Sequence, residues 1–325
     1  MSAPIDTLRY PYERVLLQRT KLAYVHLPHL LTDAKRDRAA RVFAYVGIWL
    51  GDDLILLYLQ EGEVVNATRF DGTKGRAIPI GEALAMVPPE PEMGEICFHE
   101  AADEQLACMF QTLTTVSDPW PEELVSGDGN ALFPYLMSTT YDGTLEVVAA
   151  SAVNYLIIRD GIVERAFVYG RPDITPPEAI DRLFPEARSG TRPNVRRWPV
   201  APPVPVQASP GLIRAYREVA TTLVRHLVAA GNESAPQIAE QARHRLLIAH
   251  PTLEHFTIGE RPMRDPVADA GAVTAAVAAW LAELMWAGMN GERSPEDLLR
   301  EITRDRRHMF QSAGFFDRLP WMVEW

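Results

Sequence analysis

The chain has 325 residues, a formal net charge of −11 and a composition that is 47% hydrophobic, which is enough apolar material for two or three domains with cores of their own. The acidic balance excludes the strong basic excess of a typical duplex-binding protein, so nucleic acid is not expected as a partner. Two cysteines, Cys97 and Cys108, are too few for a disulfide framework.

The first fifteen residues, MSAPIDTLRYPYERV, lack the apolar core of a secretion signal. Because neither a signal nor a disulfide framework is recognised, we expect the chain to be cytoplasmic.

In chain order, the stretch from residue 8 to residue 87 predicts a helix, three strands and a second short helix. Apolar residues recur at helical spacing between positions 27 and 34. Residues 41–50 and 54–59 are rich in β-branched, aromatic and aliphatic side chains, which predicts two strands, and residues 63–70 predict a third.

The turn between the last two of these strands is the pair Glu61-Gly62. An acidic residue followed by glycine is typical of a tight hairpin, because such turns need backbone φ angles above zero. Ala67 follows in the next strand, where a small side chain lets a strand and a helix approach each other closely.

The same pattern returns 99 residues later, since Asp160-Gly161 stands in the place of Glu61-Gly62 and Ala166 in the place of Ala67. A helix, strands and this hairpin in the same order predict a duplicated α+β unit. The two helices align as LPHLL at 27–31 with FPYLM at 133–137.

The first copy of the repeated pattern consists of Leu27, Pro28, Leu30, Leu31, Tyr58, Glu61, Gly62, Val65, Asn66 and Ala67. Through these residues the stretch 20–87 resembles the PATAN-type domain, named for the N-terminal region of bacterial PatA proteins. Residues 130–171 resemble it more loosely, with Arg165 where the first copy has Asn66.

The resemblance implies a non-enzymatic signalling or adaptor protein with roles such as motility, polarity or type IV pilus control. Relatives of this kind usually stand beside receiver domains, and we recognise no receiver domain in this sequence. What the resemblance implies is therefore a protein partner.

Residues 191–210 are rich in proline, which predicts an extended linker. It divides a first α+β unit at 1–95 and a second at 96–190 from a helical domain at 211–325. Within that domain, residues 272–289 are long enough to span a membrane. They are built on alanine and contain Glu283, so we predict a core helix and no membrane span.

No cluster of residues identifies a reaction. His244, His250 and His255 do not share a helical face, and no carboxylate stands at a zinc-ligand spacing beside them. Glycine-rich phosphate loops and nucleophile motifs are also missing from the sequence. We therefore predict no catalytic residue, no cofactor and no metal.

The C-terminal tail is unusually aromatic, and its apolar residues either pack on the helical domain or anchor a partner. The candidate partner-binding residues are Phe315, Phe316, Leu319, Trp321, Met322 and Trp325.

The fold expected is α+β, with two repeated helix-plus-antiparallel-sheet units followed by an all-α domain. The expected function is that of an adaptor acting through protein–protein interaction, with homo-oligomerisation left open. One alternative is a small-ligand sensor or enzyme with a cleft between the α+β and helical halves, near Asp265, His255 and Arg264. Another is a structural subunit of a larger assembly.

Overall fold

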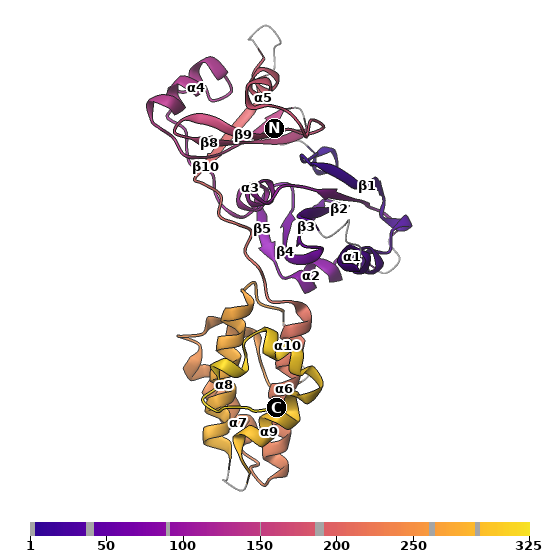
Figure 1. Ribbon diagram of the computed structural model, residues 1–325, viewed down its shortest axis with the longest axis vertical. Coiled ribbons are helices and arrows are strands. Elements are labelled where there is room, and N and C mark those ends of the chain that lie inside the picture. Colours follow the sequence, from indigo (N-terminus) through magenta and orange to yellow (C-terminus); the bar gives the residue numbers. More distant parts are fainter. Residues whose placement is uncertain are drawn as a thin grey trace. The chain divides into compact units, whose positions relative to one another are not determined.

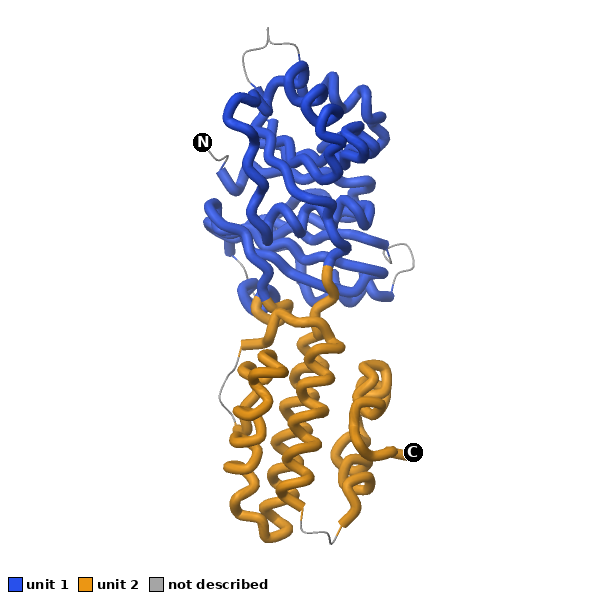
Figure 2. The backbone as a smooth tube through the Cα atoms, turned by 90° about the vertical axis from the view of Figure 1, so that its left-hand side faces the viewer, with its two compact units in different colours: residues 1–78, 83–204 blue, residues 79–82, 205–325 orange. Residues whose placement is uncertain are grey.

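The computed structural model describes residues 4–36, 42–88, 92–149, 151–185, 192–259, 264–289 and 293–325. The chain forms two compact units (Figure 2). The first comprises residues 1–78 and 83–204, and the second residues 79–82 and 205–325. Two antiparallel sheets with their helices make up the first unit, and the second is helical (Figure 1). The predicted α+β class with an all-α C-terminal part is confirmed.

The first sheet has six strands in the order β1-β6-β2-β3-β4-β5, with antiparallel neighbours throughout. Strands β2 and β3 lie at its centre and are buried along almost their whole length, which is why they read as continuous apolar runs. The strands are β1 Arg14–Lys21, β2 Ala44–Leu50, β3 Asp53–Gln60, β4 Glu63–Phe70, β5 Gly75–Ile78 and β6 Glu95–Glu100; the helices are α1 Leu27–Arg36, α2 Ile80–Ala85 and α3 Asp103–Thr114.

The second sheet has four strands in the order β10-β7-β8-β9, again antiparallel. Helix α5 begins at a capping box. The side chain of Thr175 accepts a hydrogen bond from the backbone N–H of Glu178, and the side chain of Glu178 accepts one from the backbone N–H of Thr175. The strands are β7 Gly143–Ala149, β8 Ala152–Arg159, β9 Ile162–Phe167 and β10 Asn194–Trp198; the helices are α4 Gly129–Ser138 and α5 Pro176–Leu183.

A constant offset of 99 residues relates the two sheets. Trp49 pairs with Glu95 in the first sheet, and Val148 pairs with Asn194 in the second. The hairpins match as well, down to a register shift between Tyr58 and Leu59 that recurs between the equivalent residues of β8. Strands β2, β3, β4 and β6 are therefore the equivalents of β7, β8, β9 and β10.

The repeat is longer than predicted, and two predicted boundaries are wrong. Strand β6 belongs to the first sheet, so the boundary between residues 95 and 96 cuts it off from its partners. Strand β10 pairs with β7, so the linker predicted at 191–210 contains a strand of the second copy. The proline-rich stretch becomes an extended connection only from Pro199 onward. The edge strands β1 and β5 were not predicted.

The predicted alignment of the two helices is also wrong, by about one turn. The turn glycine Gly62 lies against Ala34 of α1, and Gly161 lies against Leu136 of α4. These contacts match residue 34 with residue 136, an offset of 102 rather than 106. Pro28 is in the first turn of α1, whereas Pro134 is inside α4, so the two prolines are not equivalent.

Both sheets of the first unit contribute to one hydrophobic core. Tyr45 and Tyr58 of the first sheet, Leu106 of α3, and Tyr155 and Phe167 of the second sheet belong to the same cluster of buried side chains. The two copies therefore bury apolar surface together.

The helical unit begins its helices at polar caps. Ser209, Asp269 and Ser294 each accept a hydrogen bond from a backbone N–H of the first turn. Ser234 does not cap α7, because its hydroxyl donates to Asn232 Oδ1 instead. The helices are α6 Pro210–Ala229, α7 Ala235–Leu246, α8 Ala270–Gly288, α9 Pro295–Thr303 and α10 Arg307–Ser312.

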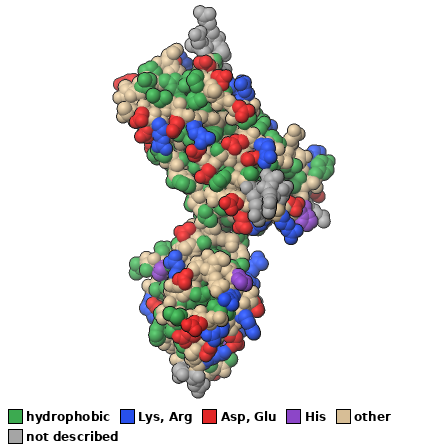
Figure 3. All heavy atoms as spheres, viewed as in Figure 1, with side chains coloured by type: hydrophobic (Ala, Val, Ile, Leu, Met, Phe, Trp, Pro, Cys, Tyr) green, Lys and Arg blue, Asp and Glu red, His purple; other side chains and the backbone are tan. Residues whose placement is uncertain are grey.

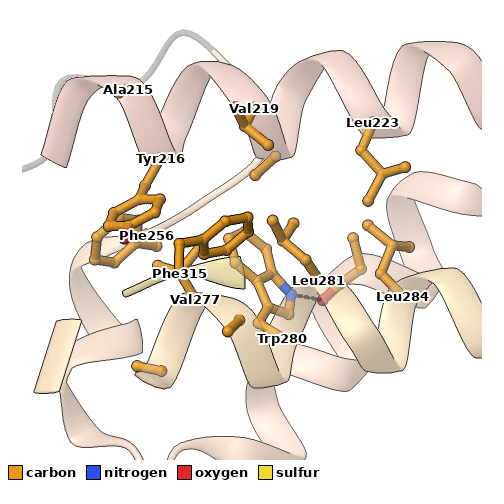
Figure 4. Packing of buried hydrophobic residues seen from close by; sticks show 14 of the residues in the cluster. Ala215, Tyr216, Val219, Leu223, Phe256, Val277, Trp280, Leu281, Leu284 and Phe315 are labelled. Atoms are coloured by element: carbon orange, nitrogen blue, oxygen red, sulfur yellow. Dashed lines mark hydrogen bonds between the residues drawn. The ribbon is translucent and has the colours of Figure 1, made fainter. Parts of the chain in front are cut away.

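Helix α8 is the central helix of this unit, as predicted. Trp280 is fully buried and its indole Nε1 donates to the carbonyl of Ala239 at 2.8 Å (Figure 4). Among the described helices α8 alone is long and apolar enough to cross a membrane, and half of its most apolar window is buried inside the unit. Such a helix is also what the centre of a helical core requires.

Candidate functional site

The predicted aromatic tail divides into a buried part and an exposed part. Phe315 is fully buried, with ring centroids 5.5 Å from Tyr216 and 5.4 Å from Phe310. Figure 4 shows Phe315 among the core side chains of the helical unit. Phe316, Leu319 and Trp321 pack against the same core. As a partner-binding residue Phe315 is therefore a wrong prediction, because the chain's own core already occupies its ring.

Two candidate residues of the tail remain at the surface. Met322 is 79% exposed and Trp325 is 38% exposed. The indole of Trp325 packs on Phe316 and lies 4.8 Å from the guanidinium of Arg307. A hydrogen bond holds the backbone of the last residues on α9, because Arg300 Nε donates to the carbonyl of Glu324 at 2.7 Å.

A surface tryptophan that the sequence reading missed joins this group. Trp286, in the last turn of α8, is 68% exposed, and its ring centroid lies 5.2 Å from that of Trp321. We call Trp286, Trp321 and Met322 the aromatic surface. Trp286 was hidden in the sequence because it belongs to a mainly apolar segment, in which a surface side chain does not differ in type from its buried neighbours.

The turn residues adopt the predicted conformation in both copies. The φ angles are 50° at Glu61 and 79° at Gly62, and 49° at Asp160 and 76° at Gly161. Two consecutive residues with positive φ make the tight hairpin turn that matches the twist of the strands. Since each glycine is packed against a helix, the four residues have a structural role in shaping the repeat.

The two alanines five positions after the turn glycines occupy equivalent places in the sheets. Ala67 is fully buried and pairs with Leu57, and Ala166 pairs with Leu156. Ala166 is only partly buried and packs against the cluster that contains side chains of α4 and α5.

The polar residues of the predicted alternative site surround an arginine that the sequence did not single out. Arg217 of α6 donates to Asp265 Oδ1 at 2.7 Å and to the carbonyls of His255 and Arg264 at 3.0 and 3.1 Å. These contacts fasten the segment before α8 to α6. In the described parts of the chain, no group of three or more His, Cys, Asp or Glu side chains is placed to hold a metal ion.

An ion pair between a buried carboxylate and a half-exposed arginine distinguishes the second copy from the first. Glu146 of β7 is 4% exposed, and Arg196 Nη2 of β10 lies 2.5 Å from its Oε1. By the 99-residue offset, the first copy has Gly47 and Cys97 at these two positions. Burial raises the pKa of the Glu146 carboxyl, and the guanidinium of Arg196 opposes this only in part. The pair links β10 to its neighbour β7 in the sheet. Strand β10 directly precedes the proline-rich connection.

A cavity of about 390 Å³ lies within the first unit, in the size range of protein ligand clefts. One wall is β9 with its continuation to Val168, and another is the extended segment Pro11–Glu13. Gln105 of α3 fixes that segment by donating to the carbonyl of Pro11 at 2.7 Å. The lining residues are Pro11, Tyr12, Glu13, Gln105, Glu164, Arg165, Ala166, Phe167, Val168, Pro172, Asp173, Ile174 and Pro176.

The ionisable side chains of this cavity are mostly acidic. Glu13, Glu164 and Asp173 line it together with one cation, Arg165; Glu164 forms an ion pair with Arg159, and Arg165 forms one with Glu104. On the face seen in Figure 3, acidic and basic side chains are interspersed on each unit. The cavity thus offers a strand, apolar side chains and an excess of carboxylates.

Comparisons with known proteins found no family model, no curated protein and no solved structure that matches the chain. The resemblance to the PATAN-type domain stays a resemblance, carried by the residues named above.

Proposed function

We propose that this chain is a non-enzymatic adaptor of the bacterial cytoplasm that acts by binding another protein. The process implied by the PATAN resemblance is motility, polarity or type IV pilus control. The observation that carries the proposal is the aromatic surface of the helical unit. Trp286 and Met322 expose 68% and 79% of their surface, although both are large apolar side chains. Tryptophan at a protein surface is typical of binding hot spots.

The test uses point variants of the full chain. Removing the tail at Gly314 would delete the core residue Phe315 and disturb the helical unit, so loss of a partner would not report on the surface. The double variant Trp286→Ala, Met322→Ala removes exposed side chains only. The matched control is Ile248→Ala, which removes an apolar side chain that is 95% exposed on the same unit.

Each variant is cross-linked in the native cell and purified by affinity, and the co-purifying proteins are quantified. We expect the wild-type chain and Ile248→Ala to retain the same proteins, and the double variant to lose at least one of them. A hot-spot tryptophan contributes about 2 kcal/mol or more to binding, which is enough to deplete a partner clearly. Retention of the same proteins by all three chains would contradict the proposal. A doubled mass of the purified wild-type chain that the double variant abolishes would assign the surface to self-assembly instead.

A further inference from the structure

The internal repeat gives a direct comparison between two strand edges. In the first copy the outer edge of β4 is covered by β5, and the pairs run from Phe70 with Gly75 to Ala67 with Ile78. By the 99-residue offset, the strand that corresponds to β4 is β9. Among the described residues no strand pairs with the outer edge of β9, which ends the sheet.

The sequence explains why the covering strand is missing from the second copy. After β9 the chain turns back at Gly170 and makes a single bridge, between Val168 and Arg171. Pro172 follows and has no N–H to donate, so pairing stops there. The positions equivalent to β5 are residues 174–177, and they contain Pro176 and Pro177, which begin α5.

The cavity lies along this uncovered edge. Glu164–Val168 form one wall of the cavity. The segment from Pro172 to Ile174, which diverges from β9, forms another wall. The space beside β9 corresponds to the space that β5 fills beside β4 in the first copy. An edge strand leaves one row of backbone N–H and C=O groups without a strand partner, and such an edge is a template for another chain. The cavity beside β9 leaves room for such a chain. An edge strand whose flank is filled by neighbouring side chains would not.

We propose that β9 binds an extended segment of a partner protein, antiparallel to β9 and in the place that β5 takes beside β4. Binding by strand addition takes its affinity from main-chain hydrogen bonds and its specificity from pockets for alternate side chains. The segment carries at least one Lys or Arg, because the carboxylates of Glu13 and Asp173 line the cavity, while Glu164 is paired with Arg159 and Arg165 with Glu104. Strand β5 itself has Arg76 at its second position.

The same charges argue for a partner protein over a second copy of this chain. Two β9 edges paired about a two-fold axis would bring the carboxylates of Glu13 and Asp173 of both copies to one interface, and like charges across an interface oppose association. The inference extends the proposed adaptor role to a second site, but its test does not depend on the aromatic surface.

The probe is a fluorescent peptide with the sequence of residues 73–80, TKGRAIPI, which contains the β5 strand and two cations. It is titrated against the purified full-length chain. We expect saturable binding together with slowed hydrogen exchange in β9. Two further peptides carry an N-methyl group at the position of Arg76 or of Ala77. Because alternate residues of a strand face the partner, one of the two should bind about tenfold more weakly and the other nearly unchanged.

A charge-reversal variant tests the recognition of the cation. Glu13→Lys, Asp173→Lys changes two exposed residues of the cavity and should weaken the peptide about tenfold at low salt. Glu122→Lys, an exposed carboxylate of the same unit outside the cavity lining, is the matched control and should leave binding unchanged.

Three outcomes would overturn the inference. They are no saturable binding, equal weakening by both N-methyl groups, and exchange protection of β9 by a second copy at high chain concentration in the absence of peptide. Since the probe and the purified chain are both defined, failure here leaves the test of the aromatic surface standing. Loss of no partner in that test would likewise leave the peptide result standing.

Discussion

At the scale of single residues, the first unit holds a histidine whose charge is linked to stability. His99 of β6 is 9% exposed, with the Tyr45 hydroxyl 2.9 Å from its Nδ1 and the ring of Tyr12 4.6 Å away. Burial lowers the pKa of His99 to about 4, because the imidazolium would lose its hydration. The folded state therefore favours the neutral ring.

The stability that follows from this shift has a defined pH window. A depressed histidine pKa contributes stability above the unfolded-state value near 6.5, and this stability is lost as the pH falls toward 4. We expect a loss on the order of 3 kcal/mol across that window, which His99→Gln should largely remove. Urea unfolding at pH 7, 5.5 and 4.5 measures it. An NMR titration that places the His99 pKa near 6.5 would contradict the expectation.

Glu146 should produce the opposite pH dependence. Burial raises its folded-state pKa, so its contribution to stability is complete below the ordinary carboxyl pKa and is lost as the pH rises through the raised value. Glu146→Gln keeps a polar partner for Arg196 and removes the buried charge. We expect the variant to gain in unfolding free energy relative to the wild type between pH 4 and pH 8.

The control for Glu146→Gln is the same substitution at a surface carboxylate of the same sheet. Glu164→Gln of β9 is suitable, because the side chain of Glu164 is 55% exposed. Surface substitutions of this kind usually change stability by about 0.5 kcal/mol or less, and no steady trend with pH is expected. A wild-type advantage that grows with pH would show instead that the pairing with Arg196 outweighs burial.

At the scale of elements, the two hairpin turns depend on glycine for two separate reasons. A Cβ at Gly62 would stand 2.1 Å from the carbonyl oxygen of Ala34, and one at Gly161 would stand 2.5 Å from that of Leu136. Both glycines also have positive φ. Gly62→Ala and Gly161→Ala should each lower the unfolding free energy by about 2 to 3 kcal/mol, because helix and turn must separate.

Gly170→Ala distinguishes the two reasons. Gly170 has a φ of 71° but no heavy atom within 4 Å of a Cβ placed there, so only the conformational cost of about 1 kcal/mol applies. Chemical denaturation of the three variants compares them directly. Equal losses at all three positions would mean that the close approach of helix and turn contributes nothing.

The sequence predicted those elements whose signals are local. The two turns and the central helix α8 each follow from a few neighbouring residues. Strand β10 could not be predicted in this way, because its contacts are distant in the sequence. Glu146, which pairs with Arg196 of β10, lies 50 positions earlier in the chain. Its two arginines resemble linker residues until the buried neighbours Val195 and Trp198 are known.

The candidate site was predicted only in part for a related reason. Aromatic composition marks the tail but does not distinguish a ring inside the core, such as Phe315, from a side chain at the surface, such as Met322. That distinction depends on α6 and α10, which supply Tyr216 and Phe310 from elsewhere in the chain. The open edge of β9 could be recognised only after the two copies were aligned strand by strand. In the sequence, that alignment is evident only at the hairpin.

At the scale of the whole molecule, the duplication explains why the first unit should behave as one cooperative body. The two sheets have separate hydrogen-bond networks, but Tyr58 of β3 and Tyr155 of β8 lie in the same buried cluster. Helix α3 links them, since the hydroxyl of Thr112 lies 3.3 Å from that of Tyr155. A core shared in this way couples the stability of both copies.

Tyr155→Ala tests this coupling. Truncation of a fully buried aromatic side chain should cost about 3 to 5 kcal/mol, and the loss should appear in both sheets because neither can keep the cluster intact alone. Hydrogen exchange followed by mass spectrometry measures protection in β3 and in β8 separately. We expect both strands to exchange faster by a similar factor. Faster exchange confined to β8, with β3 unchanged, would show that the two copies fold independently and that the shared cluster is only a contact surface between them.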